Sequence, residues 1–122
     1  MRDALVLVAH GSRDPEWMRP LQDIAARLRA LRPDLDVGLA FLELSPPGPD
    51  ELARAAAEAG AGAIYLAPLF LGQGAHARRD MAELAARLRT AHPRLGIRLL
   101  PALGEFEAVI AAAAAALAAA AA

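Results

Sequence analysis

Four short runs of consecutive apolar residues, separated by longer segments with helical spacing, constrain the fold of this chain most. The runs occupy residues 4–9, 37–44, 63–70 and 97–100. Continuous apolarity over so few residues is typical of strands that are covered on both faces. Strand and helix in turn, four times over, predict an α/β fold. We expect a three-layer sandwich in which a four-stranded parallel sheet has helices on both faces.

Apolar residues between the runs recur every three or four positions, which predicts amphipathic helices. The two clear stripes are Trp17, Leu21, Ile24, Leu28 and Leu31, and Ala77, Met81, Leu84, Leu88 and Ala91. A weaker stripe lies between Pro49 and Gly60. Pro20 either kinks the first helix or marks its first turn, because proline lacks the amide hydrogen that a helix interior needs. We see no clear internal repeat.

The end of the chain, from about residue 105 to residue 122, is rich in alanine. Alanine is the strongest helix former, so we expect a last helix here; the alternative is a frayed, partly disordered end. As a helix, the apolar run 108–122 would be about 22 Å long, too short for a bilayer core of about 30 Å. The run 4–9 is likewise too short for the core of a signal peptide. We therefore expect a cytoplasmic protein.

Composition excludes several kinds of chemistry. A length of 122 residues corresponds to one domain, residues 1–122, which can bury a core without covalent support. The absence of cysteine, with only three histidines, excludes disulfides, thiol nucleophiles and a closed four-ligand zinc site of His and Cys. All 13 basic residues are arginine, which excludes a Schiff-base lysine and a phosphate loop of the GxxxxGK type. A net charge of −1 indicates neither a nucleic acid nor a membrane surface as partner.

Chemistry is expected in the segments that directly follow the strands. In open parallel sheets, ligands bind at the carboxyl ends of strands, where the strand order reverses. His10 follows the first strand and stands beside Gly11, while His76 follows the third strand after Gly72-Gln73-Gly74. Each histidine alone has a plainer explanation: a hydrogen bond to loop backbone for His10, an ordinary strand-to-helix turn for His76.

Together, the two histidines predict a metal site if the first and third strands are neighbours. Adjacent strands lie about 4.8 Å apart, so two imidazoles at their ends can converge on one ion. Two protein ligands leave coordination positions open, as delivery or catalysis requires. Asp80, one helical turn after His76, either orients that imidazole or is simply solvated.

Other polar residues near the strand ends are less specific. Glu43 either faces the ligand crevice or marks the exit of the second strand into solvent. The hydroxyl of Ser45 is expected to serve as a cap or turn group. Three arginines flank the histidine loops and suit a ligand with several carboxylates, although a solvated helix face also accounts for the last two: Arg13, Arg78 and Arg79. We assign no catalytic role to His92.

The sequence resembles the class II chelatases, and among them the small CbiX-type sirohydrochlorin chelatases. The resemblance is carried by LVLVAHGSRDP at residues 5–15, AFLE at 40–43 and APLFLGQGAHARRDM at 67–81. It implies a chelatase half-domain with the strand order 2-1-3-4. It also implies ATP-independent insertion of divalent cobalt or ferrous iron into sirohydrochlorin, for cobalamin or sirohaem biosynthesis. No permanently bound cofactor is implied, since the metal is a substrate.

Roles for individual residues follow from the same resemblance. It implies that His10 and His76 hold the metal and act in catalysis, with His10 also accepting pyrrole protons. The residues expected to contact the tetrapyrrole are Ser12, Arg13, Glu43, Ser45, Leu71, Gly72, Gln73, Gly74 and Ala75. Longer relatives carry two half-domains, so we expect this chain to form a homodimer that could bury the alanine-rich helix.

Two other functions are compatible with the residues. One is a carrier or regulatory domain that binds a metal or tetrapyrrole without turnover. The other is phosphoryl transfer through His10, as in the arginine-histidine-glycine phosphatases; it is weakened because Ala9 stands where those enzymes have arginine. The physiological metal and the pathway are left open, because histidine sites accept several divalent ions.

Overall fold

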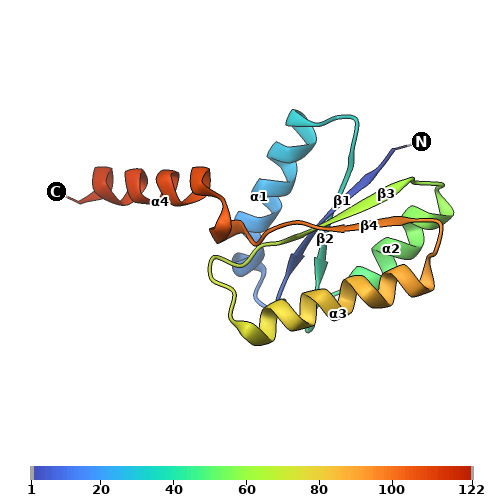
Figure 1. Ribbon diagram of the computed structural model, residues 1–122. Coiled ribbons are helices and arrows are strands. Elements are labelled where there is room, and N and C mark those ends of the chain that lie inside the picture. The colour runs from blue at the N-terminus through green and yellow to red at the C-terminus, as the bar shows by residue number, and fades with distance from the viewer. Residues whose placement is uncertain (1, 122) are drawn as a thin grey trace.

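The computed structural model describes residues 2–121 and contains a four-stranded parallel sheet (Figure 1). Its strands are β1 (Ala4–Ala9), β2 (Asp36–Phe41), β3 (Ala63–Pro68) and β4 (Gly96–Leu99). They lie in the order β2-β1-β3-β4, and every neighbouring pair is parallel. The predicted α/β fold and strand order are confirmed. The first and third strands are therefore neighbours, as the proposed site requires.

Helices cover the two faces of the sheet unequally. On one face, α2 (Pro49–Glu58) and α3 (Ala75–Ala91) lie side by side, and α1 (Pro15–Leu31) lies alone on the other (Figure 1). A 3-10 turn, η1 (Leu103–Glu105), follows β4 and leads into α4 (Glu107–Ala120), which points away from the sheet. No helix within residues 2–121 is both long and apolar enough to cross a membrane.

Several element boundaries differ from those predicted. The second strand ends at Phe41 rather than Leu44, since the chain turns there: Leu44 has a left-handed φ of 69°. The third strand ends at Pro68 rather than Phe70, and the fourth is shifted to Gly96–Leu99. Pro20 lies inside α1, while the first-turn position belongs to Pro15. The alanine-rich segment is helical from Glu107 to Ala120, so the frayed alternative is wrong over that range.

The core lies between the sheet and the α2–α3 face. Ile64 and Leu66 of β3 and Met81 and Leu88 of α3 have no exposed surface. Spacing explains this burial, since alternate strand residues and every third or fourth helix residue point to the same interface. No polar or charged side chain is buried among the described residues. The ionisable side chains described by the structure therefore all keep some exposed surface.

The structure reveals an internal repeat that the sequence analysis missed. Shifting α1 (Pro15–Leu31) by 60 residues gives the bounds of α3 (Ala75–Ala91), and β4 begins 60 residues after β2. Residues 25–29 and 85–89 both read AARLR, and a proline and a leucine follow at equal spacing in each half. Even the helix ends match, because Arg29 and Arg89 donate to the carbonyl oxygens of Val37 and Ile97, at 2.9 and 3.1 Å. The fold thus consists of two related strand–helix–strand halves.

Candidate functional site

The loops that follow β1 and β3 meet at the carboxyl edge of the sheet, and His10 lies at their contact. Its imidazole stacks on the ring of Phe70, with ring centroids 4.4 Å apart and planes inclined by 22°. The Leu69 amide donates to the Val8 carbonyl oxygen at 2.9 Å, which extends the β1–β3 pairing into this loop. His10 is exposed while Phe70 is only 5% exposed. The buried ring therefore provides a firm platform beneath an accessible imidazole.

The loop after β2 crosses directly over Gly11. The Glu43 amide donates to the His10 carbonyl oxygen at 3.0 Å. Gly11 has a φ of 114°, and a Cβ placed on it would lie 1.7 Å from the Glu43 carbonyl oxygen. Only glycine satisfies both conditions, so this close approach explains the glycine beside His10.

The side chains of the same loop serve two purposes. Glu43 is exposed and lies two residues beyond the end of β2. The Ser45 hydroxyl donates to the backbone carbonyl oxygen of Ser12, which is the turn role expected of it. Ser12 in turn accepts from the Asp14 amide at 3.0 Å, just before α1. Backbone and serine contacts thus fix the loops, and the Glu43 carboxylate forms no hydrogen bond or ion pair with the other residues from 2 to 121.

The loop from Leu71 to Ala75 offers an open surface. Leu71 is 68% exposed, and only Gln73 is half-buried. Neither Gly72 nor Gly74 has a positive φ, so a left-handed backbone does not account for these glycines. A Cβ on either would meet nothing within 4 Å. A flat ligand can therefore approach the backbone closely here.

His76 lies in the first turn of α3 and is exposed. Gly74 at the N-cap supplies no side-chain cap, so the first amide groups of the helix are available to an anionic ligand. No hydrogen bond joins Asp80 to His76 in the part of the chain that the structure describes, which removes support for an orienting role. His92 forms the opposite end of α3, at its C-cap.

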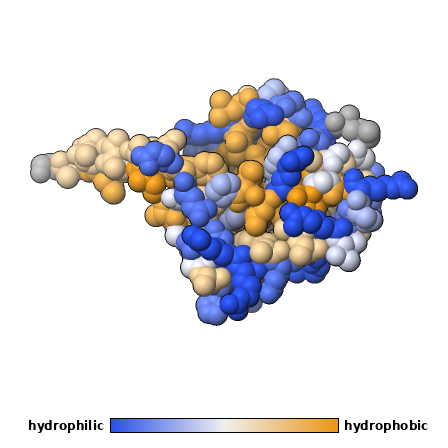
Figure 2. Space-filling view, in the orientation of Figure 1, coloured by the Kyte–Doolittle hydropathy of each residue, from blue (hydrophilic) through white to orange (hydrophobic). Residues whose placement is uncertain are grey.

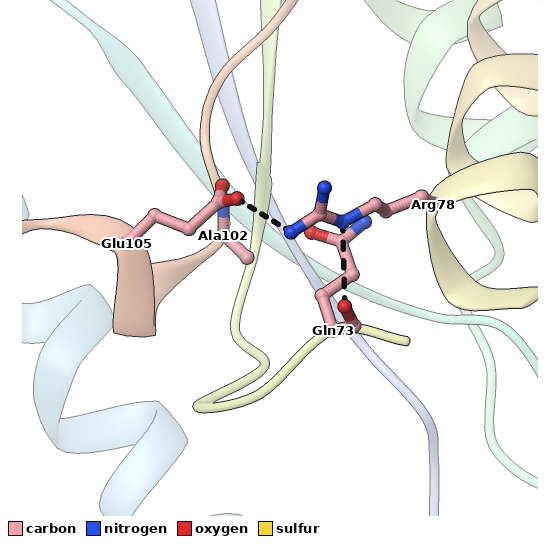
Figure 3. Close-up of polar contacts among 4 residues, drawn as sticks. All are labelled: Gln73, Arg78, Ala102 and Glu105. Atoms are coloured by element: carbon pink, nitrogen blue, oxygen red, sulfur yellow. Dashed lines mark hydrogen bonds and ion pairs between the residues drawn. The ribbon is translucent and has the colours of Figure 1, made fainter. Parts of the chain in front are cut away.

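A polar network that the sequence analysis missed holds this loop (Figure 3). Arg78 donates to the carbonyl oxygen of Gln73 at 3.3 Å and to Glu105 at 3.2 Å. Glu105 also accepts from the Ala102 amide at 2.9 Å. The Gly104 amide donates to the Phe70 carbonyl oxygen at 3.1 Å. The histidine loop is therefore tied to η1, and a single glutamate far along the chain gave no signal of it.

The remaining arginines and acidic groups stay dispersed. Arg13 and Arg79 are exposed and form no ion pair within residues 2–121. Within the same residues, no three His, Asp or Glu side chains gather closely enough to hold a metal ion. The edge thus combines two exposed imidazoles on neighbouring elements, uncapped helix amides and free guanidinium groups.

The sheet is open and parallel, and its candidate residues follow the strands at the edge where the strand order reverses. Open α/β sheets bind their ligands at this edge, so the chain belongs to that general class of proteins. The comparison with protein families is more specific. The CbiX family model matches residues 4–120, and the chain belongs to the CbiX family.

Curated relatives of this chain are named as chelatases. It is 36% identical over 81 residues to a sirohydrochlorin cobaltochelatase of Methanopyrus kandleri, a match covering 66% of this chain and 57% of the relative. It is 31% identical to a sirohydrochlorin ferrochelatase of Bacillus subtilis, with 92% of this chain and 43% of the relative covered. The matched part of the chain thus spans about half the length of these relatives.

Two solved structures have the same fold. A protein of Marinobacter aquaeolei assigned to cobalamin biosynthesis as CbiX superposes with a TM-score of 0.84 and 27% identity, covering 94% of this chain and 93% of that one. The sirohydrochlorin chelatase SirB from Bacillus subtilis subspecies spizizenii, in complex with cobalt, gives a TM-score of 0.81 and 28% identity. That match covers 96% of this chain but only 50% of SirB.

Proposed function

We propose that this protein inserts divalent cobalt or ferrous iron into sirohydrochlorin. The names of its relatives support the reaction and the substrate. The observation that carries the proposal is the meeting of the β1 and β3 loops, where His10 stacks on Phe70 and His76 begins the helix that follows. Two accessible histidines stand at the edge where such a sheet binds its ligand.

His10 and His76 are the proposed ligands of the incoming metal and the proposed bases. Inserting a divalent ion into a tetrapyrrole releases two pyrrolic protons. A neutral imidazole can hold a divalent ion or accept a proton near neutral pH, so two imidazoles can divide the tasks. Two ligands also release the ion more readily than a closed set of four. His10, whose ring stacks on Phe70, is also the proposed proton acceptor.

The surface around the histidines suits a flat substrate fringed with carboxylates. We assign the loop from Leu71 to Ala75 to the face of the macrocycle, because its backbone is open to close approach. The uncapped amides of α3, Arg13 and Arg79 can bind peripheral carboxylates. Ser12, Glu43 and Ser45 form the opposite rim, with Glu43 offering a carboxylate toward a metal or a pyrrole N–H.

A second copy of the chain is the proposed cover for the other side of the macrocycle. The match covers only 50% of SirB, so a chain of that length has room for two such units. We propose that two copies of this chain supply the corresponding surfaces as a homodimer in the cytoplasm.

The test is anaerobic absorbance spectroscopy of sirohydrochlorin with cobalt or ferrous iron. We expect protein-dependent metallation in the wild type and a loss of at least tenfold in His10→Ala and His76→Ala. His92→Ala is the matched control, since it removes the same side chain from the opposite end of α3. Metal binding without metallation would instead identify a carrier. Unchanged rates in both site variants would remove the histidines from the mechanism.

A further inference from the structure

One arginine holds the end of the loop that precedes His76. The Arg78 side chain donates to the Gln73 carbonyl oxygen at 3.3 Å and to Glu105 at 3.2 Å (Figure 3). The Arg78 amide donates to the Gly74 carbonyl oxygen at 3.1 Å and so closes the first turn of α3. A single residue thus bonds two consecutive carbonyl groups just before the helix turn that carries His76.

Glu105 is itself fixed, so it can anchor the Arg78 side chain. One of its carboxylate oxygens accepts from Arg78, and the other accepts from the Ala102 amide at 2.9 Å. Ala102 is only 1% exposed. Gly104 lies so close to the loop that a Cβ on it would be 1.5 Å from the Leu71 carbonyl oxygen. Because η1 is packed so tightly, it presents the carboxylate of Glu105 in a defined direction.

The η1 turn contacts both sides of the proposed metal site. On the side of His10, the Gly104 amide donates to the carbonyl oxygen of Phe70, whose ring stacks on the imidazole. On the side of His76, Glu105 acts through Arg78 on the loop before the helix. The direction of a helical side chain depends on the backbone that carries it. The contacts of η1 therefore bear on where both imidazoles point.

The two histidine loops are held by different kinds of bond. After β1, the Ser45 hydroxyl donates directly to the Ser12 carbonyl oxygen. After β3, the link is the ion pair of Arg78 and Glu105, whose side chains are 63% and 43% exposed. Figure 2 shows hydrophilic side chains gathered at the bottom of the view, where α3 begins. Exposed ion pairs add little to the stability of a fold, so the main effect expected of this pair is on the geometry of the loop.

Arg78 and its neighbour Arg79 face different surroundings. Successive residues of a helix point about 100° apart, so the two guanidinium groups cannot serve one surface. Arg78 points toward η1 and Gln73, whereas Arg79 is exposed and forms no ion pair with another described residue. Arg79 is thus the one suited to a carboxylate of the substrate, and Arg78 the one suited to hold the loop.

We propose that Arg78 and Glu105 are positioning residues, which place His76 opposite His10 for binding of a divalent metal. They contact neither the metal nor the tetrapyrrole and act through the backbone at Gln73. The proposal rests on the function proposed above, since it takes His76 as a ligand of the incoming metal.

The first experiment titrates cobalt into the protein without tetrapyrrole and measures the Kd by calorimetry. We expect Arg78→Met and Glu105→Gln each to raise the Kd about fivefold, less than the roughly tenfold or more caused by loss of a group bonded directly to a metal ligand. Arg87→Met is the matched control, since it removes the same side chain from the same helix, where Arg87 pairs with Asp50 at 3.0 Å. Its Kd should equal that of the wild type. An unchanged Kd in Arg78→Met, or an equal rise in Arg87→Met, would overturn the proposal.

The same titration in a His76→Ala background shows whether the pair acts through that histidine. The double variant His76→Ala/Arg78→Met should bind cobalt no more weakly than His76→Ala, because the effects of residues that act as one unit do not add. A further fivefold rise would mean that Arg78 acts independently of His76, against the proposal. If His76→Ala binds cobalt as the wild type does, or the wild type binds none, the metal site proposed above is wrong and the positioning role falls with it.

Metallation kinetics distinguish positioning from a loss of folded protein. We expect Arg78→Met to raise the KM for cobalt about fivefold and to leave the KM for sirohydrochlorin unchanged, since Arg78 does not contact the tetrapyrrole. The midpoint of thermal unfolding should fall by less than about 4 °C, as for other exposed ion pairs. A fall in kcat with both KM values unchanged would contradict positioning. If the wild type does not metallate sirohydrochlorin, the proposed reaction is wrong, whereas the cobalt titrations still decide for or against the positioning pair.

Discussion

The two halves of the sheet carry the same helix pattern but bury it to different extents. In α3, Met81, Leu84 and Leu88 are at most 3% exposed. The residues at the same positions of α1, Leu21, Ile24 and Leu28, are only half-buried. Because α2 lies beside α3 while α1 lies alone on its face of the sheet, the difference comes from the neighbouring helix rather than from the stripe itself. Complete burial in this fold therefore needs a pair of helices on each face.

At the carboxyl edge of the sheet, each half has one tight backbone contact between the loops that follow its two strands. The glycine of this contact lies in the first loop in one half and in the second loop in the other. In the first half, Gly11 after β1 meets the carbonyl group of Glu43 after β2. In the second, Leu71 after β3 meets Gly104 after β4, where a Cβ would lie 1.5 Å from the Leu71 carbonyl oxygen. Either partner can provide the space, provided that one of them lacks a side chain. Both candidate ligand loops are thus held by tight backbone packing.

The largest loss of stability is expected for Leu88→Ala. The comparison is with Leu28→Ala, at the equivalent position of the repeat. We expect the free energy of unfolding to fall by about 4 kcal/mol for the fully buried Leu88 and by about 1.5 kcal/mol for Leu28, because the cost scales with lost burial and with the cavity left. Urea denaturation of the two variants and the wild type measures both losses. Equal losses would show that α1 does not depend on a neighbour.

Gly104→Ala tests the close contact in the half that carries His76. The added methyl group would overlap the Leu71 backbone, so we expect a loss of about 3 kcal/mol in the free energy of unfolding and slower metallation. Gly72→Ala is the control in the same region. Its Cβ enters open space and its φ is not positive, so we expect a change within about 0.5 kcal/mol. Similar losses in both would refute the account of the tight contact.

Sequence patterns predicted those parts of the molecule that depend on local spacing. The first strand ends where its apolar run ends, and the stripe from Ala77 to Ala91 lies within α3, because strand and helix periods are properties of neighbouring residues. The end of β2 was misplaced because Leu42 and Leu44 continue the apolar run although the chain turns at Phe41. The repeat was missed because only a few residues, such as those of AARLR, are shared.

For the candidate site, the sequence predicted residues in the segments that follow the strands and missed those that support them. His10 and His76 follow from their position in the alternation of elements. The stacking of Phe70 beneath His10 and the Arg78–Glu105 pair join residues 60 and 27 positions apart. Contacts over such separations depend on how the loops fold against one another, and no local pattern encodes them.

The smallest loss of stability is expected at the ion pairs of Arg87 and Arg27. These arginines occupy equivalent positions of the repeat but have different partners. Arg87 of α3 donates to Asp50 of α2 at 3.0 and 3.2 Å, whereas Arg27 of α1 pairs with Asp23 of its own helix. The difference again reflects the missing neighbour of α1. We expect Asp50→Asn to cost about 0.7 kcal/mol and Asp23→Asn about 0.3 kcal/mol, since both pairs are exposed.

The pH dependence of the free energy of unfolding distinguishes the contribution of the Asp50–Arg87 ion pair from that of the other charged groups. The Arg87 guanidinium hydrogen-bonds the Asp50 carboxylate and lowers the pKa of Asp50 below its ordinary value. A lowered pKa in the folded state gives stability that is present above the unfolded value, near pH 4, and is lost as pH falls through the folded value. Arg32 lowers the pKa of Asp34 to about 2 in the same way, and that contribution is common to both proteins. Urea titrations from pH 6 to pH 2 should therefore show a shallower loss of stability in Asp50→Asn than in the wild type, and parallel curves would mean that the pair between α2 and α3 adds nothing.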